Sequence, residues 1–278
     1  MTKPITQLIL DIKGVLYNDE GNGKVLTPTS ADFIRYLNES NIPYLLATNL
    51  TSEMPRQAVS ELQKLGLDVT LDKLVSSVDV SAEYLKGHEF EFIYLVSDNP
   101  QLREFYEKNG IHLVNGSQSA VPAAVVVGLD RNLEEKTLED AARYVREGAV
   151  LVALHRNMKR VDEYGREKPN VGVTVAQIEE KAGTKSPDTV VVGKPSKLFY
   201  QIALQRLPLK NPHVTLVVGD DPQGDFPGAY ELGMRLAFVA SKKYPNWPDK
   251  MGFSPDYSVK DVGELREYVG NMSNIRSP

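Results

Sequence analysis

The feature that most constrains the fold is a short apolar run that ends on a single carboxylate. Leu8, Ile9 and Leu10 form a stretch without polar alternation, and Asp11 follows directly. Such a stretch is typical of a strand that is buried on both faces of a parallel sheet. Open α/β sheets bind ligands at the carboxyl ends of their strands, so Asp11 is a candidate functional residue. Taken alone, Asp11 could equally be the polar residue that ends the strand in a turn.

Apolar runs of the same kind recur along the chain, with segments of helical periodicity between them. In residues 31–39, Phe33, Ile34 and Leu37 recur at helical spacing. Alternation of strands and helices predicts right-handed crossovers and a parallel sheet. Residues 17–30 are polar and rich in turn-forming types, so we expect a loop there. Further strands are expected at residues 43–47, 189–193, 214–218 and 236–239.

The middle third of the chain has a pattern of its own. Residues 92–96, 123–127 and 150–154 are typical of strands, and helical segments lie between them. This pattern predicts a second α/β unit that need not share a core with the first. Candidate N-caps precede several of the expected helices, namely Ser52, Thr137, Ser196 and Thr174, the last in a capping box with Gln177.

The composition excludes several classes of protein. The chain has 278 residues and a net charge of -5, so nucleic acid is not the expected partner. It has no cysteine, which excludes disulfides and thiolate metal sites and fits a cytoplasmic location. No apolar run approaches the ~20 residues of a membrane span, and no secretory segment precedes the first strand, so we expect no membrane partner.

Chemically reactive side chains follow four of the predicted strands. In a parallel sheet these strand ends meet at one edge. Carboxylates there would bind Mg²⁺ through oxygen, and one carboxylate could attack phosphorus. Lysine and threonine would bind phosphate oxygens. The pattern therefore predicts a phosphoryl-transfer site built from Asp11, Thr48 with Asn49, Lys194, and Asp220 and Asp221 with Asp225.

These segments resemble the haloacid dehalogenase (HAD) superfamily of phosphatases. Residues 11–16, 48–49, 193–195 and 219–225 occur in the order of that family's motifs. The long segment between the second and third motifs resembles the capped subfamily IIA, and most of all the phospholysine phosphohistidine inorganic pyrophosphate phosphatase group. The resemblance implies an α/β protein with a Rossmann-like core of parallel strands, formed by residues 1–79 and 186–278. Residues 80–185 would form an inserted α/β cap domain.

The resemblance also implies roles for the individual residues. Asp11 would be the nucleophile and a Mg²⁺ ligand, together with the backbone carbonyl of Lys13 and the carboxylate of Asp220. Either Asp221 or Asp225 would lie in the outer shell of the metal. The phosphoryl oxygens would be held by Thr48, the amide of Asn49 and Lys194. On the residues alone, Asp225 could instead cap the next helix, and Lys194 could be a solvated lysine.

Lys13 departs from the family pattern. Most of these phosphatases have Asp two residues after the nucleophile as general acid/base, and loss of such a group costs ~10²–10⁴ in rate. A lysine beside Mg²⁺ is also repelled, so it must point away, lose its proton or replace the metal. Lys13 could contact the leaving group, or water could carry the protons in a slow reaction. Alternatively the protein binds its ligand without turnover, or Lys13 is merely solvated.

The predicted cap carries a basic loop after the strand at 150–154. Arg156, Lys159, Arg160 and Arg166 form either a rim that attracts anionic substrates or an ordinary solvated loop. The resemblance further implies a homodimer that pairs through the cap. We therefore expect a Mg²⁺-dependent phosphatase that acts on a small phosphorylated compound, such as a phosphoester, pyrophosphate or phosphoramidate. The alternative is a weak or inactive protein that binds a phosphorylated ligand.

Overall fold

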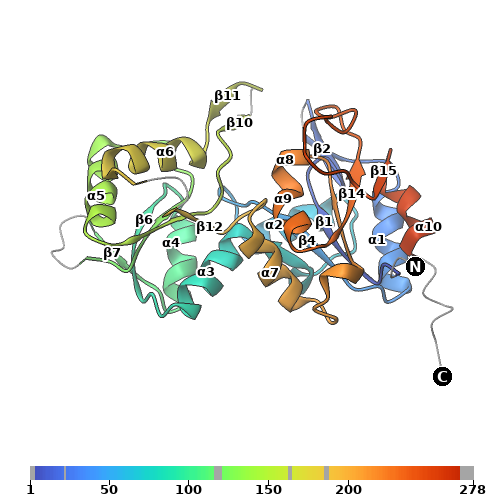
Figure 1. The fold of residues 1–278 in the computed structure, drawn as a ribbon, viewed down its shortest axis with the longest axis horizontal. Coiled ribbons are helices and arrows are strands. Elements are labelled where there is room, and N and C mark those ends of the chain that lie inside the picture. The colour runs from blue at the N-terminus through green and yellow to red at the C-terminus, as the bar shows by residue number, and fades with distance from the viewer. Residues whose placement is uncertain (1–3, 22, 116–120, 162–164, 185–187, 270–278) are drawn as a thin grey trace. The chain divides into compact units, whose positions relative to one another are not determined.

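The computed structural model describes residues 4–21, 23–115, 121–161, 165–184 and 188–269. The chain forms two compact units (Figure 1). The core unit comprises residues 1–48, 55–75 and 194–278, and the inserted unit comprises residues 49–54 and 76–193. The sequence analysis predicted domain boundaries after residues 79 and 185. The second predicted boundary lies outside the described residues.

Six strands form the sheet of the core unit, in the order β15-β14-β13-β1-β4-β5. Neighbouring strands from β15 to β4 are parallel. On the central strand, Leu8, Ile9 and Leu10 are fully buried, which explains why this run has no polar alternation. The predicted α/β class with a parallel sheet is therefore confirmed. The strands are β1 (Gln7–Asp11), β4 (Tyr44–Thr48), β5 (Leu74–Ser76), β13 (Thr215–Gly219), β14 (Arg235–Val239) and β15 (Tyr257–Val259).

Helices connect these strands and bury their apolar faces. The hydroxyl of Ser196 accepts a hydrogen bond from the amide of Phe199 at 3.2 Å, so Ser196 caps α7 as predicted. The predicted N-cap at Ser52 is wrong, because α2 begins at Pro55, and proline is favoured in the first helical turn. The helices are α1 (Ser30–Glu39), α2 (Pro55–Lys64), α7 (Lys197–Arg206), α8 (Pro222–Asp225), α9 (Pro227–Glu231) and α10 (Arg266–Val269), with 3₁₀ turns at Leu71–Lys73, Pro212–Val214 and Val262–Leu265.

The segment that was expected to be a loop forms a β-hairpin. β2 (Tyr17–Glu20) and β3 (Gly23–Leu26) pair antiparallel, with Tyr17 opposite Leu26 and Glu20 opposite Gly23. The dipeptide Gly21-Asn22 between the strands is a hairpin signal, which the prediction of a loop overlooked. The hairpin follows the turn after β1 directly and so begins close to Asp11 along the chain.

The inserted unit contains a second parallel sheet, in the order β12-β9-β8-β6-β7. β12 (Val190–Val191) pairs with β9, so the strand predicted at 189–193 belongs to this sheet and not to the core sheet. The other strands are β6 (Phe92–Val96), β7 (His112–Val114), β8 (Ala124–Val127) and β9 (Val150–Ala153), and β10 (Lys159–Val161) and β11 (Glu167–Pro169) form a separate hairpin. The helices are α3 (Ser77–Gly87), α4 (Pro100–Lys108), α5 (Glu135–Arg146) and α6 (Val171–Ala182).

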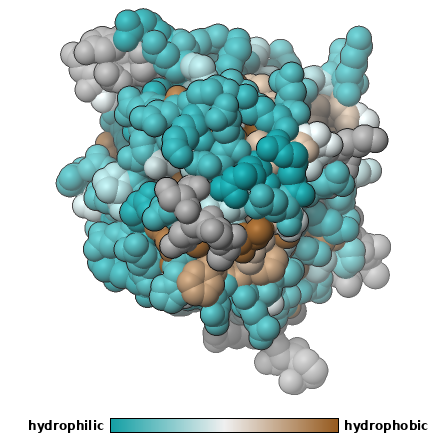
Figure 2. All heavy atoms as spheres, turned by 90° about the vertical axis from the view of Figure 1, so that its left-hand side faces the viewer, coloured by the Kyte–Doolittle hydropathy of each residue, from teal (hydrophilic) through white to brown (hydrophobic). Residues whose placement is uncertain are grey.

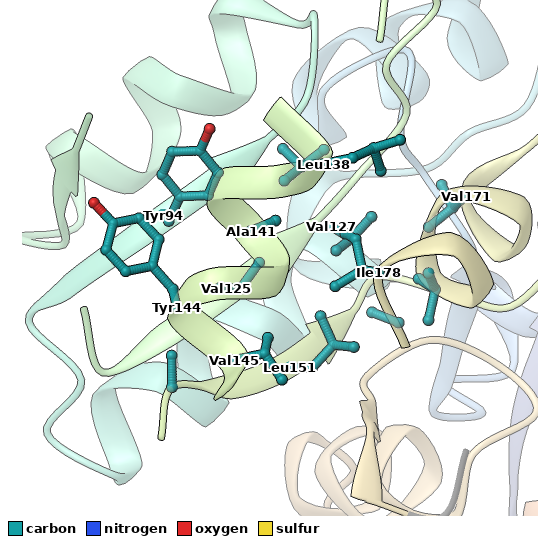
Figure 3. Packing of buried hydrophobic residues seen from close by; sticks show 14 of the residues in the cluster. Tyr94, Val125, Val127, Leu138, Ala141, Tyr144, Val145, Leu151, Val171 and Ile178 are labelled. Carbon is teal, nitrogen blue, oxygen red and sulfur yellow. The ribbon is translucent and has the colours of Figure 1, made fainter. Parts of the chain in front are cut away.

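Two of these helices, α5 and α6, contribute to the hydrophobic core of the inserted unit (Figure 3). Leu138 and Ala141 of α5 and Ile178 of α6 lie with Val125 and Val127 of β8, and all are buried. The inserted unit therefore has a core of its own, whereas its pattern of strands and helices predicted only that it need not share the core of the first unit.

Polar residues dominate the face of the molecule that lies on the left in Figure 1. Figure 2 shows this face, on which hydrophobic residues gather in one small area within a hydrophilic surround. Over the part of the chain that the structure describes, no helix has both the length and the apolar character needed to cross a bilayer.

Candidate active site

Three of the predicted site residues lie at one edge of the core sheet. Asp11 is the last residue of β1, and Thr48 is the last residue of the adjacent strand β4. The register pairs Asp11 with Ala47, so Thr48 lies one residue beyond it. Asp220 directly follows β13, the neighbour of β1 on the other side. The parallel arrangement thus brings these residues to the same edge, as expected of ligand sites in open α/β sheets.

A cluster of three carboxylates forms at this edge. Oxygen atoms of Asp11, Asp220 and Asp225 all lie within 4.8 Å of one another. Asp11 ends a strand, whereas Asp225 is carried back towards the sheet by the single turn of α8. Clustered oxygen ligands of this kind suit a hard divalent cation such as Mg²⁺. The donor set therefore fits the predicted metal.

Lys194 lies within the same cluster. Its Nζ donates to Asp11 Oδ1 at 2.5 Å and to Asp225 Oδ1 at 2.7 Å. The residue is only 5% exposed, so the alternative of a solvated lysine is wrong. Lys194 comes from the start of the segment that leads into α7, not from a strand of the core sheet. The sequence predicted that Lys194 lies beside Asp11, but it predicted that a strand of the core sheet ends directly before Lys194, and this strand belongs to the other sheet.

The two aspartates that the sequence could not distinguish have different partners. Asp225 Oδ2 accepts from the amides of Asp220 at 3.2 Å and Asp221 at 3.0 Å. Asp221 caps α8 by accepting from the amides of Gln223 at 3.1 Å and Gly224 at 3.0 Å. The alternative that Asp225 caps the next helix is wrong, because Phe226 occupies the N-cap position of α9 and no side chain caps that helix.

The cluster has an excess of negative charge. Burial, reinforced by the neighbouring Asp225, raises the pKa of Asp11 to about 8 and that of Asp220 to about 6. Burial alone would lower the pKa of Lys194, but the carboxylates of Asp11 and Asp225 outweigh it and raise that pKa. One ammonium group thus faces three carboxylates, and a bound cation would relieve their mutual repulsion.

Gly14 lets Asp220 approach the turn after β1. Its φ is +91°, a backbone conformation that favours glycine, and a Cβ at this position would lie 2.3 Å from Asp220 Cγ. No other residue type fits there without a shift of the carboxylate. Gly14 thus contributes to the geometry of the cluster although it offers no side chain.

Lys13 forms an ion pair with a residue that is not part of the carboxylate cluster. Its Nζ lies 2.5 Å from Asp19 Oδ2 on β2, and both side chains are more than half exposed. Its predicted part in catalysis and metal binding stays a prediction. Asp19 is a partner that sequence reasoning missed, because the hairpin that carries it was expected to be a loop.

Asn49 and the basic loop belong to the inserted unit. The side-chain oxygen of Asn49 lies where a Cβ on Gly193 would come within 2.6 Å of it. Arg156 forms an ion pair with Glu179, and Lys159 lies 2.7 Å from Glu167. At least these two cations are thus paired within their own unit. The phosphate-binding roles of Thr48 and Asn49 stay predictions.

Two further residues that the sequence did not single out surround the cluster. The phenolic hydroxyl of Tyr200, on α7, donates to the backbone carbonyl of Asp225 in the buried interior. Lys243 Nζ lies 2.6 Å from Asp221 Oδ2. Neither residue belongs to a motif, so no local pattern in the sequence could have identified them.

Comparison with known proteins identifies the class of this chain. A family model described as haloacid dehalogenase-like hydrolase matches residues 8–112, and a HAD-hydrolase-like model matches residues 191–265. The two matches lie on either side of most of the inserted unit. The chain is thus an enzyme of the HAD hydrolase class.

Individual relatives narrow the assignment. Ribonucleotide monophosphatase NagD of Escherichia coli is 27% identical over 263 residues, which cover 94% of this chain and 98% of that protein. The bovine haloacid dehalogenase-like hydrolase domain-containing protein 2 is 28% identical over 245 residues, which cover 87% of this chain and 86% of that protein. The crystal structure of a 4-nitrophenylphosphatase from Thermotoga maritima is 28% identical with a TM-score of 0.81, covering 95% of this chain and 97% of that one. The chain belongs to the capped HAD phosphatases of subfamily IIA.

Proposed function

We propose that this protein is a Mg²⁺-dependent phosphatase that hydrolyses a small phosphorylated compound through an aspartyl-phosphate on Asp11. The observation that carries the proposal is the contact of Asp11 with the buried Lys194 inside a cluster of three carboxylates. Relatives that are named as phosphatases for ribonucleotide monophosphates and 4-nitrophenyl phosphate support the reaction class.

In the proposed mechanism the carboxylate of Asp11 attacks the phosphorus atom. A bond forms between its oxygen and phosphorus, and the bond from phosphorus to the leaving group breaks. Water then hydrolyses the acyl phosphate, which releases phosphate and restores the carboxylate. Lys194 favours the ionised form of Asp11 and so offsets part of the pKa rise that burial and Asp225 cause, and it offers its ammonium to the phosphoryl oxygens. Asp225, which accepts from Lys194 and from two backbone amides, fixes the position of that lysine.

Asp11 and Asp220, with the carbonyl of Lys13, would hold Mg²⁺. The ion would neutralise charge on the phosphoryl group as it is transferred. Asp225 is already engaged by Lys194 and backbone amides, so we assign it and Asp221 supporting roles around the metal ligands.

The position of Lys13 bears on the choice of substrate. It offers an ammonium at the position where most phosphatases of the resembled superfamily have the aspartate that acts as general acid/base, so the leaving group must depart without help from a carboxylic acid there. Pyrophosphate, phosphoramidates and aryl phosphates meet that requirement better than alkyl phosphates. The same observation favours the second candidate function, a protein that binds a phosphorylated ligand with little turnover.

The test is phosphate release from p-nitrophenyl phosphate, pyrophosphate, phosphoglycolate, nucleotide monophosphates and a phosphoramidate, with Mg²⁺ and with chelator. We expect turnover that needs the metal and is lost in Asp11→Asn. Asp32→Asn, which changes an exposed aspartate of α1, is the matched control and should retain activity. Turnover that persists in Asp11→Asn would remove the mechanism. No turnover on any substrate, with Mg²⁺ still raising the melting temperature, would favour the binding protein.

We also propose a cytoplasmic location and a homodimer that pairs through the inserted unit. The lack of cysteine supports the first. Analytical ultracentrifugation of the full chain tests the second, and a monomer at micromolar concentration would overturn it.

A further inference from the structure

The ammonium of Lys13 has an acidic partner on the β2–β3 hairpin. Lys13 Nζ lies 2.5 Å from Asp19 Oδ2, with 62% of the Lys13 side chain and 54% of the Asp19 side chain exposed. The backbone accounts for this contact. The amide of Gly14 donates to the carbonyl of Tyr17 at 2.8 Å, and Lys13 forms a β-bridge with Tyr17. Asp19 lies two residues further along β2 and hence on the same side of the strand as Tyr17.

The position of this ammonium matters because Lys13 is only two residues from Asp11. The carboxylate cluster already contains one lysine, Lys194, which contacts Asp11 and Asp225. A second free ammonium near the same edge would compete with a divalent cation for the carboxylate oxygens and repel it. An exposed ion pair adds little to the stability of a fold. Loss of the Asp19 partner would thus leave the fold intact and change mainly where the Lys13 ammonium lies.

We propose that Asp19 is a positioning residue that holds the Lys13 ammonium away from the carboxylates that bind Mg²⁺. The proposal rests on the proposed function, since it assumes that Asp11 and Asp220 bind the metal. It explains how a chain of this class keeps a metal site with lysine two residues after the nucleophile: the hairpin supplies the compensating carboxylate. Asp19 acts through Lys13 and makes no contact with substrate in this role.

The test is a double-mutant cycle read out as the Kd for MgCl₂, measured by isothermal titration calorimetry on the full chain without substrate. We expect Asp19→Asn to weaken Mg²⁺ binding by about fivefold, because the released ammonium repels the ion. In the Lys13→Gln background the same substitution should have little effect. Glu20→Gln is the matched control, because it removes a neighbouring exposed carboxylate on the same strand and its pair with Lys242. It should change the Kd by less than about twofold.

Each outcome decides the proposal. If Asp19→Asn weakens Mg²⁺ binding equally with and without Lys13, Asp19 acts through its own charge and the proposal is wrong. If Asp19→Asn leaves the Kd unchanged while the wild type binds Mg²⁺, the proposal fails and the proposed function stands. If the wild type does not bind Mg²⁺, both fail. Unchanged melting temperatures in the absence of Mg²⁺ would verify that all variants are folded.

Discussion

At the scale of single residues, Gly14 is the position where the backbone limits the site most. We predict that Gly14→Ala lowers the metal-dependent activity by at least about tenfold, because a Cβ there displaces the Asp220 carboxylate and strains a positive-φ residue. Phosphate release at increasing Mg²⁺ concentration measures the effect. Gly87→Ala is the control, since a Cβ at that helical position meets nothing within 4 Å. Equal activities of the two variants would contradict the prediction.

The residues of the site were predictable in part. Asp11 and Asp220 could be identified because each directly follows a buried apolar run, and parallel strands end at one edge. The partners of Asp221 and Asp225 could not be identified, because they depend on how the single turn of α8 orients two carboxylates within one short segment. Contacts between residues far apart in sequence, such as Tyr200 with Asp225, leave no local signal at all.

At the scale of elements, α7 is the helix that follows Lys194, and its first turn depends on Ser196. We predict that Ser196→Ala lowers the free energy of unfolding by about 1 kcal/mol, because the amide of Phe199 loses its capping partner. Ser196→Asn should retain most of the stability, since asparagine also caps helices well. Urea denaturation of the three proteins measures the difference. A Ser196→Asn variant as unstable as Ser196→Ala would show that the hydroxyl has another role.

The other predicted caps show where sequence reasoning about elements ends. Thr137 lies inside α5, which begins at Glu135, and Thr174 lies inside α6, which begins at Val171 after the cap Asn170. In both cases a residue type that favours N-caps is present, but the helix begins before that residue. The threonine therefore lies within the helix and does not cap it. The assignment of β12 was wrong for a related reason. A short apolar run in the sequence is compatible with a strand of either sheet. Only the pairing of β12 with β9 shows that β12 belongs to the sheet of the inserted unit.

At the scale of the whole molecule, the alternation of strands and helices was enough to predict two α/β units, since each parallel sheet needs its own covering helices. This alternation could not predict which ionisable side chains each unit buries. His155, which follows β9 in the inserted unit, is 2% exposed, and its Nδ1 accepts from the amide of Asn157 at 3.1 Å. Burial lowers the pKa of His155 from 6.5 to about 4. The folded protein therefore holds a neutral imidazole.

This buried imidazole makes the stability of the protein depend on pH in a defined direction. Below pH 6.5 the unfolded chain binds a proton at His155, whereas the folded chain does not bind it until about pH 4. The contribution of the neutral imidazole to the free energy of unfolding is therefore fully present above pH 6.5 and decreases as the pH falls from 6.5 to about 4. Between about pH 7.5 and about pH 5 the wild type should lose about 2 kcal/mol more than His155→Gln, which cannot titrate. Chemical denaturation of both proteins at each pH measures the difference, and other titrating groups cancel in the comparison. Parallel pH profiles would mean that the imidazole accepts its proton in the folded state, and hence that the site is open to water.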